Sequence, residues 1–180
     1  WVEIVGSTTL NFHPQSHLEE RLGRPLPKDV LDRRVGRRTE LVLAQEVLPG
    51  VVQLAQEARA AGIKLGVASS SSAEWVRGHL QRLGILEQFD CLRCRDDVVH
   101  VKPEPDLYLA VLECLGVSAP AAIAIEDSPN GIAAAKRAGM RCVAIPNSIT
   151  QQLDFSKADV VLSSLALVTL TQLLGRLGPD

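Results

Sequence analysis

One stretch of the sequence decides the fold, and it reads AIAIEDSPNGIAAAKRAG over residues 122–139. Ala122–Ile125 is apolar and of strand length, which predicts a buried strand. Ser128 and Pro129 suit the cap and the first position of a helix, and the alanine-rich run after them continues that helix. Gly139 closes it. The stretch is therefore a strand, a loop with two carboxylates and a helix, which is the repeating unit of an α/β protein.

The same alternation continues on both sides of this unit. Further strands are expected at residues 64–69, 89–92, 141–145 and 159–162. Further helices are expected from Val51 to Gly62, from Val76 to Gly84, from Leu107 to Gly116 and over the leucine-rich C-terminus. Short apolar strands that alternate with helices predict a Rossmann-like parallel sheet with helices on both faces. In such sheets, ligands bind beyond the carboxyl ends of the strands.

The first 47 residues differ, because they predict helices only. One helix should run from Pro14 to Leu22 and end at Gly23, and a longer one should open near Pro27. The longer helix carries a basic cluster of Arg33, Arg34, Arg37 and Arg38. Acidic residues interleave with this cluster at helical spacing, which favours a solvated face over an anion site. We therefore expect a helical domain over residues 1–47 and an α/β core over residues 48–180.

Composition narrows the class of partner. The 180 residues are 46% apolar and 22% charged, which is ordinary for a globular protein. Aromatic residues make up only 3%, and the net charge is −2, so neither stacking on bases nor a strong basic field favours nucleic acid. Neither a membrane span nor a signal peptide is predicted. A monomer in the cytoplasm that binds a small polar molecule is expected.

The four cysteines are Cys91, Cys94, Cys114 and Cys142. They supply one Cys-x-x-Cys pair and two isolated residues, and no second pair stands at metal-ligand spacing. We expect reduced, structural cysteines, with metal binding or redox chemistry as the alternative.

Polar residues that could take part in binding or catalysis stand at three places, each at the end of a predicted strand or in a loop. Ser69 to Ser72 follow the strand at 64–69, where hydroxyls beside a helix N-terminus can hold a phosphate oxygen or simply cap the helix. Lys102 stands in a loop stiffened by two prolines. Glu126 and Asp127 follow the strand at 122–125, and two adjacent carboxylates there favour Mg²⁺, although Asp127 or Ser128 could instead cap a helix. Glycine-rich nucleotide loops and the Gly-x-Ser-x-Gly elbow are absent from the sequence, which disfavours a dinucleotide-binding domain and a serine hydrolase.

The order of Ser69, Lys102 with its Pro-x-Pro-Asp continuation, and Glu126-Asp127-Ser-Pro-Asn-Gly resembles three motifs of the haloacid dehalogenase-like superfamily, in its branch of β-phosphoglucomutase-like phosphatases and mutases. The resemblance covers Leu48 to about Leu170, and the helices before it look like part of an inserted helical cap. It implies a Mg²⁺-dependent phosphatase that acts on a small phosphorylated metabolite, with a sugar phosphate as one candidate, through an aspartyl-phosphate. Ser69, Ser70 and Ser71 would bind the substrate, Ser69 and Lys102 would act in catalysis, and Glu126 and Asp127 would hold the metal.

The sequence departs from this family at one motif. The family's nucleophile lies in an Asp-x-Asp segment after an apolar strand, and none of the 180 residues forms Asp-x-Asp. By resemblance, that strand would lie between those ending at Ser69 and Ile125. We expect the strand to lie outside this sequence. Without the nucleophile, we expect the chain alone to be inactive. Residues 6–9 read GSTT, without the Arg that related mutases often carry there, which favours a phosphatase. A phosphomutase and a non-catalytic domain that binds phosphate or metal remain the alternatives.

Overall fold

The computed structural model describes residues 13–178, and residues 6–9 lie outside that range. The described residues divide into two compact units, with the boundary between Val47 and Leu48. The helical unit holds α1 (Pro14–Leu22) and α2 (Lys28–Leu43), both near their predicted positions. Neither of these two helices contains a buried residue.

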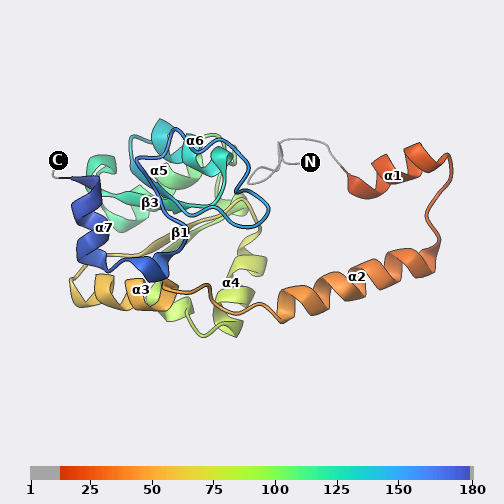
Figure 1. The fold of residues 1–180 in the computed structure, drawn as a ribbon, viewed down its shortest axis with the longest axis horizontal. Helices are drawn as coiled ribbons and strands as arrows, with labels where there is room; N and C mark the ends of the chain where they lie inside the picture. The colour runs from red at the N-terminus through yellow and green to blue at the C-terminus, as the bar shows by residue number, and fades with distance from the viewer. Residues whose placement is uncertain (1–12, 179–180) are drawn as a thin grey trace. The chain divides into compact units, whose positions relative to one another are not determined.

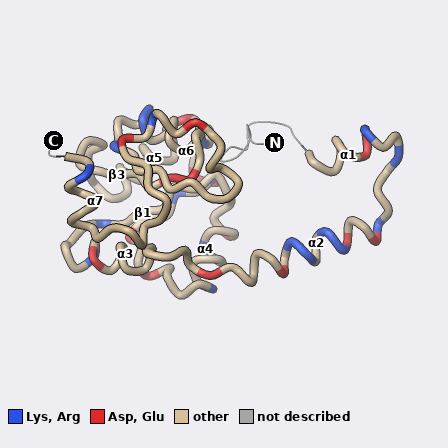
Figure 2. Tube along the Cα trace, in the orientation of Figure 1, with Lys and Arg blue, Asp and Glu red and all other residues tan. Residues whose placement is uncertain are grey.

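Charges of both signs alternate along α2 (Figure 2). Arg33 pairs with Asp29 at 3.0 Å, and Arg37 pairs with Glu40 at 3.2 Å. All four side chains of these pairs are largely exposed. The prediction of a solvated helix face is therefore confirmed for these residues.

The α/β unit alternates strands and helices in the predicted order (Figure 1). Its strands are β1 (Gly66–Ala68), β2 (Cys91–Arg93), β3 (Ile123–Glu126), β4 (Arg141–Ala144) and β5 (Val160–Val161). Its α-helices are α3 (Val51–Ala60), α4 (Ala73–Arg82), α5 (Asp106–Leu115), α6 (Pro129–Arg137) and α7 (Leu170–Leu177). Every strand and helix lies within a few residues of its predicted place.

All strand pairs are parallel, but they form two sheets rather than one. The first sheet has the order β1-β2, and the second has the order β3-β4-β5. In the second sheet Ile125 lies opposite Val143, and Glu126 lies opposite Ala144. Within residues 13–178, β1 pairs only with β2, and β3 only with β4. One edge of each of these two strands therefore has no partner strand among the described residues.

Helices cover both faces of the β3-β4-β5 sheet. Successive side chains of a strand point to opposite faces, so neighbouring residues of β4 show what packs on each face. Cys142 and Ala144 of β4 belong to a core cluster with residues of α5 and α6. Val143, between them, belongs to a second cluster with residues of α3 and α7. The predicted parallel sheet with helices on both faces is confirmed.

The cysteine prediction is half wrong. Cys91 of β2 and Cys114 of α5 form a disulfide, with their Cα atoms 6.3 Å apart. That distance lies within the range that a disulfide can bridge, and only the packing of α5 on β2 brings the two residues together. Cys94 and Cys142 are free and buried, as expected.

No helix among residues 13–178 has both the length and the apolar character needed to cross a membrane.

Candidate active site

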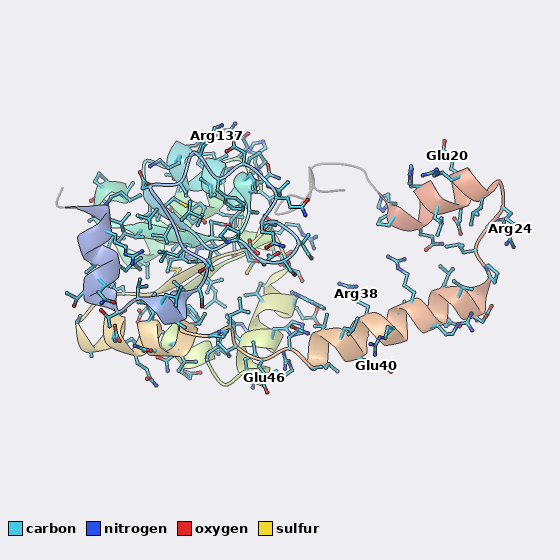
Figure 3. The ribbon with its side chains drawn as sticks, viewed as in Figure 1. Glu20, Arg24, Arg38, Glu40, Glu46 and Arg137 are labelled. Carbon is cyan, nitrogen blue, oxygen red and sulfur yellow. A yellow bond between two sulfur atoms is a disulfide. The ribbon has the colours of Figure 1, made fainter. Side chains whose placement is uncertain are left out.

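The loop before α5 carries Lys102, and a contact from another helix holds it. Arg137 of α6, labelled in Figure 3, donates a hydrogen bond to the Pro103 carbonyl oxygen at 2.8 Å. The same guanidinium pairs with the Glu104 carboxylate at 2.9 Å. The backbone that follows Lys102 is thus tied to the helix that follows β3, which limits where the lysine side chain can reach.

Lys102 is buried and pairs with a buried carboxylate. Its Nζ atom donates to Oε1 of Glu126, the last residue of β3. Tyr108 of α5 donates its hydroxyl to the same oxygen. The Lys102 ammonium also lies 4.9 Å from the centre of the Tyr108 ring, within range of a cation–π contact. Lysine and glutamate are rarely buried unless they are paired, and here each satisfies the other.

Gly131 of α6 closes the remaining side of the Glu126 carboxylate. A Cβ atom added at Gly131 would collide with the Glu126 carboxylate where it now lies. Glycine therefore leaves room for this orientation of the carboxylate. Glu126 is therefore held by an ammonium, a hydroxyl and the backbone of α6.

Asp127 is the next residue, and it is exposed. Its Oδ2 atom accepts a hydrogen bond of 2.9 Å from Nδ2 of Asn147. Loss of hydration raises the pKa of Asp127, the Glu126 charge raises it further, and the Asn147 hydrogen bond opposes the shift. A carboxylate whose charge is disfavoured in this way would be stabilised by a cation.

Asn147 lies just after β4 and is held in place by its own turn. Its backbone N–H donates to the hydroxyl of Thr150 at 3.0 Å, and its side-chain oxygen accepts from the backbone of Ile149 at 2.8 Å. Thr150 is completely buried. The amide group that contacts Asp127 is therefore fixed rather than free to turn.

The serines that follow β1 form a tight turn. Ser69 continues the pairing with β2, because its N–H donates to the Arg93 carbonyl at 2.9 Å, and its Oγ atom accepts from the N–H of Ser71 at 3.2 Å. Ser72 caps α4 by accepting from the Trp75 N–H at 3.4 Å. The alternative of a helix cap thus applies to Ser72, while Ser69, Ser70 and Ser71 precede the cap.

The structure joins two of the predicted site residues directly, Lys102 and Glu126, and it places Asp127 beside them. Ala68, the residue before Ser69, packs against the core cluster that contains Tyr108 and Ala124 of β3. The ends of β1 and β3 thus border the same core. Sequence reasoning missed Tyr108 and Asn147. The position after the strand at 141–145 pointed toward Asn147, whereas nothing in the pattern of the α5 helix distinguished Tyr108 from a core aromatic residue.

The chemistry of these groups fits Mg²⁺ at Asp127, because the metal prefers carboxylate oxygens. Glu126 is less suited, since its Oε1 atom already accepts from Lys102 and Tyr108. Among residues 13–178, no three His, Cys, Asp or Glu side chains gather into a metal-binding group. The metal role predicted for Glu126 and Asp127 remains a prediction. Burial raises the pKa of the nearby Cys142 thiol to about 12, which disfavours its thiolate form.

Comparison with known proteins assigns the family. The family described as haloacid dehalogenase-like hydrolase matches residues 9–145. The chain belongs to this family. Its relatives include YhcW of Bacillus subtilis (strain 168), which is 41% identical over 178 residues, with 98% of this chain and 80% of that protein covered. Hexitol phosphatase B of Escherichia coli (strain K12) is 34% identical, with 84% of this chain and 69% of that protein covered.

Solved structures of the family agree with the fold. A crystal structure of a CbbY mutant from Rhodobacter sphaeroides, in complex with xylulose-(1,5)bisphosphate, superposes with a TM-score of 0.70 at 37% identity. The match covers 83% of this chain and 70% of that one. Relatives and structural neighbours belong to the β-phosphoglucomutase-like branch, which confirms the resemblance drawn from the motifs.

Proposed function

We propose that this protein is a Mg²⁺-dependent phosphatase that removes phosphate from a small phosphorylated metabolite, such as a sugar or polyol phosphate. The observation that carries the proposal is the buried Lys102–Glu126 pair beside the exposed carboxylate of Asp127. A related protein is named hexitol phosphatase B, and a CbbY mutant binds xylulose-(1,5)bisphosphate. Both names support a phosphorylated sugar or polyol as the substrate class.

Lys102 would neutralise the transferring phosphoryl group. Two like charges about 4 Å apart repel by about 4 kcal/mol at an effective dielectric constant near 20, and an anionic nucleophile must approach an anionic phosphate. An ammonium between them removes that repulsion and stabilises the charge of the transition state. Glu126 would keep the ammonium at the strand end, and Ser69, Ser70 and Ser71 would donate hydrogen bonds to phosphate oxygens.

Asp127 is the residue of this chain that would bind Mg²⁺, and its hydrogen bond with Asn147 would fix the orientation of the carboxylate. When bound, the metal would add positive charge beside the phosphate oxygens. Without a cation, the pKa of Asp127 is raised. A bound cation would lower it again, because a nearby positive charge favours the charged carboxylate. Glu126 contributes through Lys102.

The aspartate nucleophile would come from a strand that the 180 residues do not include. We propose that this strand carries Asp-x-Asp and pairs between β1 and β3, each of which has one unpaired edge among the described residues. The phosphoryl group would pass to the aspartate and then to water, which releases inorganic phosphate. Residues 1–47 would belong to a helical cap domain.

The test uses the protein expressed from its native reading frame. Phosphate release from a panel of sugar and polyol phosphates is measured with Mg²⁺ and with a chelator. We expect turnover that needs Mg²⁺ and that Asp127→Asn abolishes. Asp154→Asn is the matched control, because the exposed Asp154 carboxylate interacts with its own turn, where it accepts a hydrogen bond from the Ser156 N–H at 2.8 Å; it should retain full activity.

Three results would contradict parts of the proposal. Unchanged activity in Asp127→Asn would remove Asp127 from the metal site. Transfer of phosphate to a sugar hydroxyl, rather than to water, would identify a phosphomutase. Binding of phosphate or Mg²⁺ without turnover of any substrate would identify a non-catalytic binding domain.

A further inference from the structure

Tyr108 is the chain's only tyrosine, and it lies on the buried face of α5. Leu107, Val111 and Leu112 share that face and are all apolar. Packing alone would be served by a phenylalanine, which has the same ring without a polar atom. A buried hydroxyl needs a partner, and this one donates to Glu126.

We infer that Tyr108 is a positioning residue, whose hydroxyl holds the Glu126 carboxylate and thereby sets the place of the Lys102 ammonium. This inference rests on the proposed phosphatase function. Tyr108 touches Glu126 through its hydroxyl and faces Lys102 with its ring, so one side chain contacts both members of the buried pair.

The geometry explains why a third group is needed. A carboxylate that meets only an ammonium can rotate about its last bond, and the lysine stem can follow it. Here Oε1 accepts from Lys102 and Tyr108 together, and Gly131 packs against Oε2. Both oxygens are therefore fixed. The ammonium has three N–H groups, of which Glu126 engages one side, so others can turn toward a phosphate.

Burial keeps the Tyr108 hydroxyl protonated. Loss of hydration, with the Glu126 charge as the second cause, holds the pKa of Tyr108 well above its usual value. The group therefore remains a hydrogen-bond donor throughout the neutral range.

The first experiment compares Tyr108→Phe with Leu112→Ala in the protein expressed from its native reading frame. Tyr108→Phe keeps the ring and removes the hydroxyl. Leu112 lies one turn further along α5 in the same core cluster, so Leu112→Ala loosens the packing without touching Glu126. We expect kcat to fall about tenfold in Tyr108→Phe, with KM changed less than about twofold, since a hydrogen bond to a charged group is lost.

Leu112→Ala should lose more thermal stability than Tyr108→Phe and yet keep the wild-type kcat. A Tyr108→Phe kcat within about twofold of wild type would overturn the inference, because loss of the hydroxyl should be felt in the chemical step. An equal loss of kcat in Leu112→Ala would also overturn it, since the effect would then come from packing.

A second measurement needs neither variant. In wild-type protein carrying ¹³C-labelled tyrosine, the Tyr108 hydroxyl proton should exchange slowly with water and resonate downfield. Rapid exchange, as in free tyrosine, would overturn the inference. This readout does not depend on turnover: a protein with a protected hydroxyl that hydrolyses no phosphomonoester would refute the proposed function, while the contact to Glu126 would stand.

Discussion

The ends of β1 and β3 carry the two halves of the candidate site, and they are built differently. At the end of β3, Glu126 and its partner Lys102 are charged and buried, and side chains from α5 and from the loop before it hold the Glu126 carboxylate. At the end of β1 the serines are half-buried, and backbone N–H groups hold them within a local turn. The first arrangement depends on residues far apart in the sequence, and the second depends on neighbours.

This difference predicts how each half responds to mutation. A buried ion pair that loses one member leaves a charge without compensation, which costs far more than the pair contributes. A serine in a turn that loses its hydroxyl can be replaced in part by water. Single substitutions at the β3 end should therefore lower the free energy of unfolding strongly, whereas those at the β1 end should change it little.

The largest effect is expected for Lys102→Ala. Turnover should fall by about a hundredfold or more, because the charge that stabilises the transition state is gone. The free energy of unfolding should also fall by about 3 kcal/mol, because Glu126 is 8% exposed and would be left without its cation. Phosphate release and urea unfolding measure the two effects.

The double variant Lys102→Ala with Glu126→Gln separates them. Removing the carboxylate charge should restore most of the lost stability, while turnover stays low. A double variant no more stable than Lys102→Ala would show that the buried charge was not the cause. A fully active Lys102→Ala would remove the lysine from the mechanism.

A matched pair of helix caps provides a smaller and sharper comparison. Ser128 caps α6 after β3 and is 1% exposed, and Ser72 caps α4 after β1 and is half-buried. Ser128→Ala should cost about 2 kcal/mol, because the Gly131 N–H loses its acceptor in a dry site, and Ser72→Ala should cost about 0.5 kcal/mol. Urea unfolding of both variants measures the difference. Equal losses would contradict the contrast between the two strand ends.

The fold was predictable because its signals are local. The helix from Pro14 to Leu22 needs only a proline at its start and a glycine after its end, and the strand ending at Glu126 needs only an apolar run. The disulfide was not predictable, since Cys91 and Cys114 are brought together by the packing of a helix on a strand 23 residues away. Periodicity carries no information on such a contact.

The candidate site divides in the same way. Lys102, Glu126 and Asp127 could be singled out because they stand in loops between predicted strands and helices, and because their order resembles motifs of the family. The pairing of Lys102 with Glu126 could not be predicted. The sequence of β3 predicts where Glu126 lies, but not that its carboxylate turns toward Lys102. Tyr108 was hidden for a related reason: its hydroxyl acts inside the core, while its ring satisfies the apolar pattern of α5.

The smallest expected effect concerns Asp127 in metal-free protein, where solvent screens an exposed carboxylate. Its pKa is raised above the usual 3.8, so the folded protein binds the proton more tightly than the unfolded chain does. Stability should therefore fall as the pH rises from about 3.8 through the raised pKa, and the deficit should persist at neutral pH. Asp127→Asn removes the titration, so in the presence of a chelator it should be more stable than wild type at pH 7, with the difference shrinking toward pH 4. Thermal unfolding across that range tests the sign. A variant less stable than wild type at pH 7 would mean that the Asn147 hydrogen bond outweighs lost hydration and the Glu126 charge, and that Asp127 does not need a cation.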